Sequence, residues 1–199
     1  MADRNPSDEL HAVAPVVSIG VTGHRALGDV ARMRALIDAA VDSIVADTRV
    51  RLGAEPALRA VSAIAEGADR LVVEQVLRHP GSTLEVVLPL DQDAYADDFE
   101  TAQSRLVFAE LLERAAVVVR APAVATRDRA YEAAGRAVVD RSDVVLALWD
   151  GQPARGRGGT AQIVAYALAR GVRVLWVQTE PPYEVVEIVE LPAGRPHAT

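Results

Sequence analysis

A glycine-rich turn stands between an apolar run and a segment with helical periodicity. Residues 156–160, Gly-Arg-Gly-Gly-Thr, follow the apolar run 144–149 and open the helical pattern. A bare backbone turn at the start of a helix leaves unpaired N–H groups at the positive end of the helix dipole, and both favour a phosphate. We therefore predict an anion site at Gly158, Gly159 and Thr160, with the Thr160 hydroxyl in the first helical turn.

A second glycine turn, Gly-Val-Thr-Gly-His-Arg at 20–25, follows the first apolar run of the chain. Gly23 allows close approach of the backbone to a ligand, and the Arg25 fork suits a phosphate or carboxylate. His24 can donate a proton near neutral pH. The alternative is that Gly23 only makes the turn, and that His24 and Arg25 brace neighbouring loops. Two such turns on one sheet indicate a nucleotide-like ligand.

The loop Ala-Glu-Gly-Ala-Asp at 65–69 follows the second apolar run and opens a helix. An acidic residue at this place can accept hydrogen bonds from ribose hydroxyls. Glu66 and Asp69 also suit a first helical turn, because acidic side chains complement the helix dipole there. We include Glu66, Gly67 and Asp69 among the expected ligand contacts, with both interpretations open.

Trp149, Asp150 and Gly151 end the fifth apolar run. The Trp149 ring can pack in the core or lie against a purine. Asp150 is well placed to bind sugar hydroxyls or a base edge. These three residues complete the predicted binding set.

The segment 89–99 carries four aspartates, Asp91, Asp93, Asp97 and Asp98. Such clusters can bind Mg²⁺, but a solvated loop and helix cap is the commoner outcome, so we expect neither a metal nor a cofactor. The chain has no cysteine, which excludes disulfides and thiolate chemistry.

Short β-branched runs alternate with helical patterns along the chain, and this alternation must position the loops named above. The expected strands are Val16–Val21, Arg59–Ile64, Leu84–Leu88, Ala116–Arg120, Asp143–Trp149 and Val172–Gln178. They are nearly continuous in apolar residues, which is typical of strands covered on both faces. Helical stripes separate them, one of which comprises Phe99, Ala102, Leu106 and Ala109. The pattern predicts an α/β, Rossmann-like, doubly wound and mostly parallel sheet of about six strands with helices on both faces.

The expected organisation is a flexible leader at 1–14, one Rossmann-like domain at 15–180 and an extension at 181–199. Within the extension, Tyr183–Leu191 favours a short edge strand because it is rich in valine and isoleucine.

The 199 residues carry a formal net charge of −7, and no run reaches the roughly 18 apolar residues that a membrane span needs. A negative overall field repels polyanions, which disfavours nucleic acid as a partner. We expect a cytoplasmic protein without membrane contact, with a small nucleotide-like ligand and self-association into a homo-oligomer.

The two glycine turns, with Ile-Ala-Glu-Gly-Ala-Asp at 64–69 and Trp-Asp-Gly at 149–151, give a chain that resembles the SLOG superfamily. This Rossmann-like group includes the DNA-processing protein A family and the Lonely Guy phosphoribohydrolases. The resemblance runs from about residue 19 to residue 177 and implies a nucleotide or nucleotide-derived ligand over the strand ends.

Members that cleave N-glycosidic bonds carry a glutamate in a Gly-Thr-x-x-Glu pattern, and this chain departs from that pattern. Gly159 and Thr160 match the Gly-Thr pair, but the glutamate position falls on Ile163, next to Gln162. An isoleucine can neither attack an anomeric carbon nor stabilise an oxocarbenium ion. The leading interpretation is thus a nucleotide-binding or sensing domain. The alternative is an N-glycosidase or phosphoribohydrolase that uses a relocated carboxylate, for which Glu66, Asp69 and Asp150 are the candidates.

Overall fold

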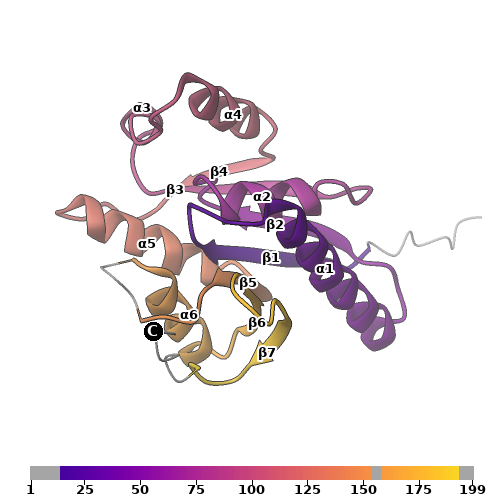
Figure 1. The fold of residues 1–199 in the computed structure, drawn as a ribbon. Coiled ribbons are helices and arrows are strands. Elements are labelled where there is room, and N and C mark those ends of the chain that lie inside the picture. The colour runs from indigo at the N-terminus through magenta and orange to yellow at the C-terminus, as the bar shows by residue number, and fades with distance from the viewer. Residues whose placement is uncertain (1–13, 154–157, 193–199) are drawn as a thin grey trace, which may run out of the picture.

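A seven-stranded sheet forms the centre of the computed structural model, which describes residues 14–153 and 158–192 (Figure 1). Nearly all of the predicted leader, the end of the tail and two residues of the glycine-rich turn, Gly156 and Arg157, lie outside the described residues. The strands are β1 (Val16–Gly23), β2 (Ala57–Ser62), β3 (Thr83–Leu88), β4 (Val117–Arg120), β5 (Val144–Trp149), β6 (Arg173–Gln178) and β7 (Val185–Ile188).

The strand order is β4-β3-β2-β1-β5-β6-β7. Every neighbouring pair is parallel except β6 with β7, which is antiparallel. The prediction of a mostly parallel α/β sheet is confirmed, and the arrangement is consistent with a Rossmann-like fold. The predicted edge strand is present as β7, which makes the seventh strand.

The helices are α1 (Val30–Leu52), α2 (Ala68–Val76), α3 (Gln92–Ala96), α4 (Ala102–Glu113), α5 (Arg127–Val139) and α6 (Thr160–Ala169). Residues of α1, α2 and α4 share one buried cluster with the sheet, whereas α6 and α5 pack in two other clusters. The sheet is therefore covered on both faces, and Figure 1 shows α3 and α4 over its β3–β4 end.

Strand β5 shows why continuous apolar runs in the sequence correspond to strands of this sheet. All six of its residues are buried. Val144, Leu146 and Leu148 pack in the cluster with α1 and α2, and the three alternate residues pack in the cluster with α6. Successive side chains on a strand point to opposite faces, so a strand covered on both sides must be apolar throughout.

Some helices of the sheet begin with a capping side chain and others do not. Asp29, Thr101 and Thr126 cap α1, α4 and α5 by accepting a backbone N–H of the first turn. In contrast, α2 and α6 begin after Gly67 and Gly159, and neither has a capping side chain among the described residues. Their first N–H groups are left for other partners.

The stripe expected from Phe99 to Ala109 was wrong. The buried residues of α4 are Ser104, Phe108 and Leu111, whereas Leu106 is 52% exposed. The physical reason is that α4 begins after Phe99 and packs in the core through Phe108 and Leu111, which lie on a different face from Leu106. Strand β4 also departs from the expectation of burial on both faces, because Val117 and Val118 lie exposed at the sheet edge.

No helix within 14–153 or 158–192 combines the length and the apolar character that a membrane crossing requires.

Candidate functional site

The strand order reverses between β1 and β5, and the two loops that carry most of the predicted site leave these strands side by side. Gly23 is in register with Leu148, and the His24 N–H donates to the Leu148 carbonyl at 3.0 Å. In open α/β sheets this reversal opens a crevice beyond the carboxyl ends of the strands, where ligands bind.

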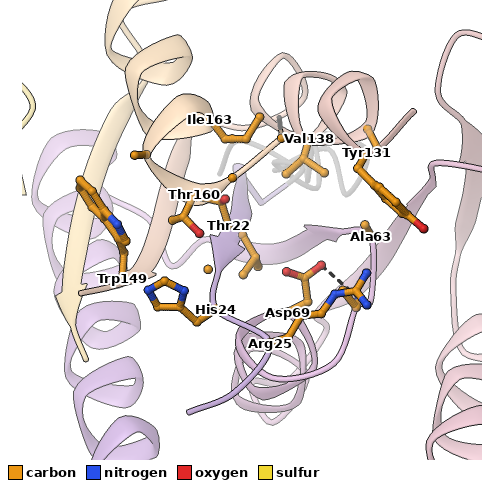
Figure 2. Close-up of a pocket in the computed structure, with 18 of the residues that line it drawn as sticks. Thr22, His24, Arg25, Ala63, Asp69, Tyr131, Val138, Trp149, Thr160 and Ile163 are labelled. Carbon is orange, nitrogen blue, oxygen red and sulfur yellow. Dashed lines mark hydrogen bonds between the residues drawn. The ribbon is translucent and has the colours of Figure 1, made fainter. Parts of the chain in front are cut away.

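A cavity of about 410 Å³ lies at this place, within the size range typical of small-molecule sites. Figure 2 shows its lining residues, with His24 and Thr160 toward one end and Asp69, Arg25 and Tyr131 toward the other. Nine of the twelve predicted residues line it: Gly23, His24, Arg25, Asp69, Trp149, Asp150, Gly158, Gly159 and Thr160.

The amino terminus of α6 forms one wall of the cavity. Gly159 is its N-cap, and Thr160 begins the helix with its side chain largely buried. The Gly158 N–H does not face a ligand, because it donates to Oε1 of Gln162 at 2.9 Å. Among the residues of this turn that the structure describes, those whose N–H groups remain for an anion are therefore Gly159 and Thr160, at the positive end of the helix dipole.

Gln162 holds the glycine turn against α5. Its Nε2 donates to Oε1 of Glu132 at 2.9 Å while its Oε1 accepts the Gly158 N–H. A Cβ atom on Gly158 would lie 3.0 Å from the Glu132 backbone nitrogen, and the φ angle of Gly158 is 73°. A larger residue at 158 would meet both the close helix and an unfavourable backbone conformation.

His24 and Asp150 lie in contact across the first and fifth strands. Nε2 of His24 accepts the Asp150 backbone N–H at 3.2 Å and is 3.3 Å from Asp150 Oδ1. A neutral imidazole satisfies the first contact, and a protonated one satisfies the second. Asp150 Oδ1 also accepts the Gln152 N–H at 2.9 Å. The pair thus braces the two loops and presents one polar surface to the cavity.

The Trp149 ring follows the core alternative. It is only 3% exposed, and its centroid lies 5.7 Å from that of Trp176. Its Nε1 donates to the Gln152 carbonyl, and Trp176 Nε1 donates to the Trp149 carbonyl. The ring is part of the cavity wall rather than a free platform for a base.

Asp69 is a buried carboxyl group inside the cavity. The Ser62 hydroxyl donates to its Oδ2 at 2.8 Å, and the Ala65 N–H donates to the same oxygen at 3.3 Å. Burial raises the pKa of Asp69 to about 6, because removing water disfavours the charged form. The Ser62 hydrogen bond and the charge of Arg25 act in the opposite direction but do not cancel this effect.

The backbone beside Asp69 is strained. Ile64 is fully buried and has a φ angle of 51°, in the left-handed region that a β-branched residue rarely adopts. The Arg70 side chain holds this conformation, since its Nε donates to the Ile64 carbonyl at 3.1 Å and its Nη1 donates to Ser104 Oγ at 2.8 Å. Strain of this kind clusters at functional sites, and here it shapes the wall formed by Ala63 and Ala65.

Three predicted residues lie outside the cavity lining. Glu66 accepts a hydrogen bond from the Ser104 hydroxyl. Gly67 allows the loop after β2 to lie against the loop after β1, because a Cβ atom on Gly67 would lie 2.1 Å from the Arg25 carbonyl oxygen. Gly151 has a φ angle of 80°, and a Cβ atom there would lie 3.0 Å from the Trp176 ring.

Helix α5 contributes lining residues that the sequence did not single out, among them Tyr131 and Gly135. The Tyr131 hydroxyl donates to the Asp98 carboxylate, and the Arg25 guanidinium lies 5.8 Å from the ring centroid. In the sequence, the helical stripe Ala130, Ala134, Ala137 and Val138 indicated only that one face of this helix is buried. No local signal placed this helix over the end of β1.

Within the described parts of the chain, no group of three or more His, Asp or Glu side chains is arranged to hold a metal ion. Two of the clustered aspartates instead form ion pairs, Asp91 with Arg120 and Asp98 with Arg127.

Neither a protein-family model nor a curated protein matches this chain.

Proposed function

We propose that this protein binds a phosphate-bearing small molecule, a nucleotide or phosphosugar, in the cavity at the ends of β1 and β5. One observation carries the proposal: the uncapped start of α6 opens into the same cavity as His24 and Arg25. The resemblance to the SLOG superfamily points to the same class of ligand.

The phosphate belongs at the α6 end of the cavity. Backbone N–H groups at Gly159 and Thr160 sit at the positive end of the helix dipole, and the Thr160 hydroxyl adds a donor. His24 can bring a further donor when it is protonated.

The rest of the ligand would extend toward Arg25 and Asp69. The wall between the two ends includes the apolar side chains Val21, Val138 and Ile163, which suit a flat ring better than a second charged group. This combination of an anion cradle, an apolar middle and a polar far end is the basis for favouring a nucleotide.

Titration calorimetry of the purified protein with adenosine 5′-monophosphate, ADP-ribose, a cyclic nucleotide and ribose 5-phosphate tests the proposal. Thr160→Val keeps the shape of the side chain and removes the hydroxyl, so it should lower the affinity for phosphate esters about tenfold. Thr48→Val is the matched control, because the buried Thr48 hydroxyl bonds only within α1, to the Ile44 carbonyl. The absence of saturable binding across the panel would remove the proposal.

A second candidate function is hydrolysis of an N-glycosidic bond, and the buried acid Asp69 in the cavity favours it. In such a reaction the C–N bond breaks as the carboxyl proton passes to the leaving base, water attacks the anomeric carbon, and the proton that this water loses returns to the carboxylate. Release of free base that is abolished in Asp69→Asn would support this function, and no release from any tested nucleotide would exclude it.

Self-association is also a proposal. Val117, Val118 and Leu106 expose apolar surface on β4 and α4, and an unpaired edge strand can pair with a second copy. Light scattering tests it: a monomer at all concentrations would contradict it, and Val118→Lys should lower the mass of an oligomer.

A further inference from the structure

The two oxygens of the Asp69 carboxyl group have different surroundings. The Ile64 N–H donates to Ser62 Oγ at 2.8 Å, which leaves the Ser62 hydroxyl hydrogen for Asp69 Oδ2. Oδ2 also receives the Ala65 N–H, and the Ala63 backbone adds a further hydrogen bond to the carboxyl group. An oxygen that accepts two hydrogen bonds is a poor place for a proton, so a proton on this carboxyl group resides on Oδ1.

Oδ1 is the oxygen that a ligand can reach. Figure 2 shows one Asp69 oxygen in the dashed hydrogen bond and the other turned toward the middle of the cavity, on the side of Thr22 and His24. A proton held there is a directional donor into the binding space.

Two arginine charges act on Asp69, and neither forms a hydrogen bond to it among those given for the described residues. Arg25, in the loop after β1, and Arg70, on α2, act on it through space, and Tyr95 of α3 is buried beside it. Glu66 is turned away to Ser104, and His24 contacts Asp150 on the other strand. Across the cavity, Tyr131 of α5 is hydrogen-bonded to Asp98.

Binding of a phosphate-bearing ring should favour the neutral form of the Asp69 carboxyl group over its charged form. A ring that covers the carboxyl group removes the remaining water, which disfavours its charged form. A phosphate at the α6 end adds negative charge to the same cavity, which also favours the neutral acid. A sugar hydroxyl donating to Oδ1 would have the opposite effect.

We propose that Asp69 binds the non-phosphate end of the ligand as a neutral acid, with Oδ1 donating to a ring nitrogen or carbonyl oxygen, so that binding takes up a proton. This inference rests on the proposed function and narrows its ligand class. A nucleotide base offers such acceptors over an apolar wall, and a simple sugar phosphate does not. Asp69 thereby distinguishes nucleotides from phosphosugars.

Calorimetry in two buffers of different ionisation enthalpy measures the proton uptake. With adenosine 5′-monophosphate near neutral pH, the wild-type protein should take up roughly half a proton to one proton more than Asp69→Asn does. The comparison isolates Asp69, because the ligand and every other ionisable group of the chain are the same in both proteins. Affinity of the wild type should fall about tenfold more than that of Asp69→Asn between pH 6 and pH 8. Ribose 5-phosphate should show no such difference.

Two variants complete the test. Asp91→Asn is the control, because Asp91 is an exposed partner of Arg120 and does not line the cavity. Ser62→Ala removes a donor to Oδ2 and so favours the neutral acid. Ser62→Ala should therefore raise the pH at which nucleotide affinity has fallen to half. This measurement tests the proposal even if Asp69→Asn does not fold.

Nucleotide binding with equal proton uptake in the wild type and Asp69→Asn, or with proton release, would overturn the role of Asp69 and leave the proposed function intact. A pH of half affinity in Ser62→Ala that is unchanged or lower would overturn it as well. No saturable binding of the nucleotide, ribose 5-phosphate or inorganic phosphate would overturn both proposals.

Discussion

Gly135 of α5 and Ile163 of α6 pack so closely that a Cβ atom on Gly135 would lie 2.7 Å from Ile163 Cδ1. Both residues line the cavity. The contact explains how two neighbouring helices close over the ends of β1 and β5. At position 163, where the glycosidases that the sequence resembles carry a glutamate, this chain has an apolar side chain that packs between two helices.

Gly135→Ala should destabilise the fold by about 1–3 kcal/mol through overpacking, even though alanine favours a helix by about 1 kcal/mol over glycine. Ile163→Val removes Cδ1 and alone should cost about 1 kcal/mol. Because it also makes room for the new methyl group, the double variant should be more stable than the two single costs predict. Urea unfolding of the four proteins measures this coupling, and simple additivity would contradict the contact.

Gly23→Ala, at the end of β1, should be far more damaging than Gly28→Ala in the loop that follows. A Cβ atom on Gly23 would lie 2.5 Å from Ala68 Cβ and 2.7 Å from the Leu148 carbonyl oxygen, and neither can move without its backbone. Nothing lies within 4 Å of a Cβ atom on Gly28. We expect a loss of about 2 kcal/mol or more in the free energy of unfolding for the first variant, and of less than about 0.5 kcal/mol for the second. Equal effects in thermal unfolding would refute the close approach of β1, β5 and α2.

The sheet, and the close approach of the loops after β1 and β5, could be predicted because the sequence patterns that indicate them are local. Six consecutive apolar residues at β5 must be buried on both faces, and a glycine turn after a parallel strand must lie at the carboxyl edge. These two facts are enough to bring Gly23 and Thr160 to one crevice without any knowledge of contacts between distant segments.

The parts that could not be predicted depend on tertiary placement. The sequence left Asp69 between two roles, and only its burial in the fold raises the pKa of this carboxyl group to about 6. Tyr131 became a wall residue because the connection from β4 to β5 carries α5 over the sheet. Helix α4 buries the face with Phe108 and Leu111, which hydrophobic periodicity alone did not distinguish from the face with Leu106.

Asp69→Asn should change how stability depends on pH. The pKa of Asp69 is raised to about 6 in the folded chain, above its value of about 3.9 in an unfolded chain. The folded state therefore binds the proton more tightly, and this contribution is full below about pH 4 and is lost as the pH rises through 6. From about pH 5 to pH 7.5 the wild type should lose on the order of 1 kcal/mol relative to the variant. Parallel pH profiles from denaturant unfolding would speak against a buried acid.

Arg70→Lys should weaken both the fold and the cavity wall. A lysine ammonium cannot reproduce the planar fork that reaches the Ile64 carbonyl and Ser104 together, nor the stacking of Arg70 over Phe99 at 4.6 Å. We expect a loss of about 1–2 kcal/mol in the free energy of unfolding and weaker nucleotide binding. The exposed Arg51, changed to lysine, is the control. An unchanged variant would show that Ile64 keeps its conformation without Arg70.

Gln162→Glu should disrupt the glycine turn, although it introduces the carboxylate that the chain lacks next to position 163. The new carboxylate could still accept the Gly158 N–H, but it would face the Glu132 carboxylate across the 2.9 Å contact that Gln162 Nε2 now makes. We expect a loss of about 1–3 kcal/mol in the free energy of unfolding, and weaker binding of phosphate esters.

Adding Glu132→Gln to the Gln162→Glu variant places an amide donor at position 132 opposite the carboxylate acceptor at position 162. The new amide at position 132 would donate to the new carboxylate at position 162, and the lost ion pair between Glu132 and Arg136, which is partly exposed, should cost less than about 1 kcal/mol. The double variant should therefore recover most of the stability and of the affinity for adenosine 5′-monophosphate. A double variant no better than Gln162→Glu alone would mean that the turn is held in another way, since the exchange of the two groups preserves every hydrogen bond between Gly158, position 162 and position 132.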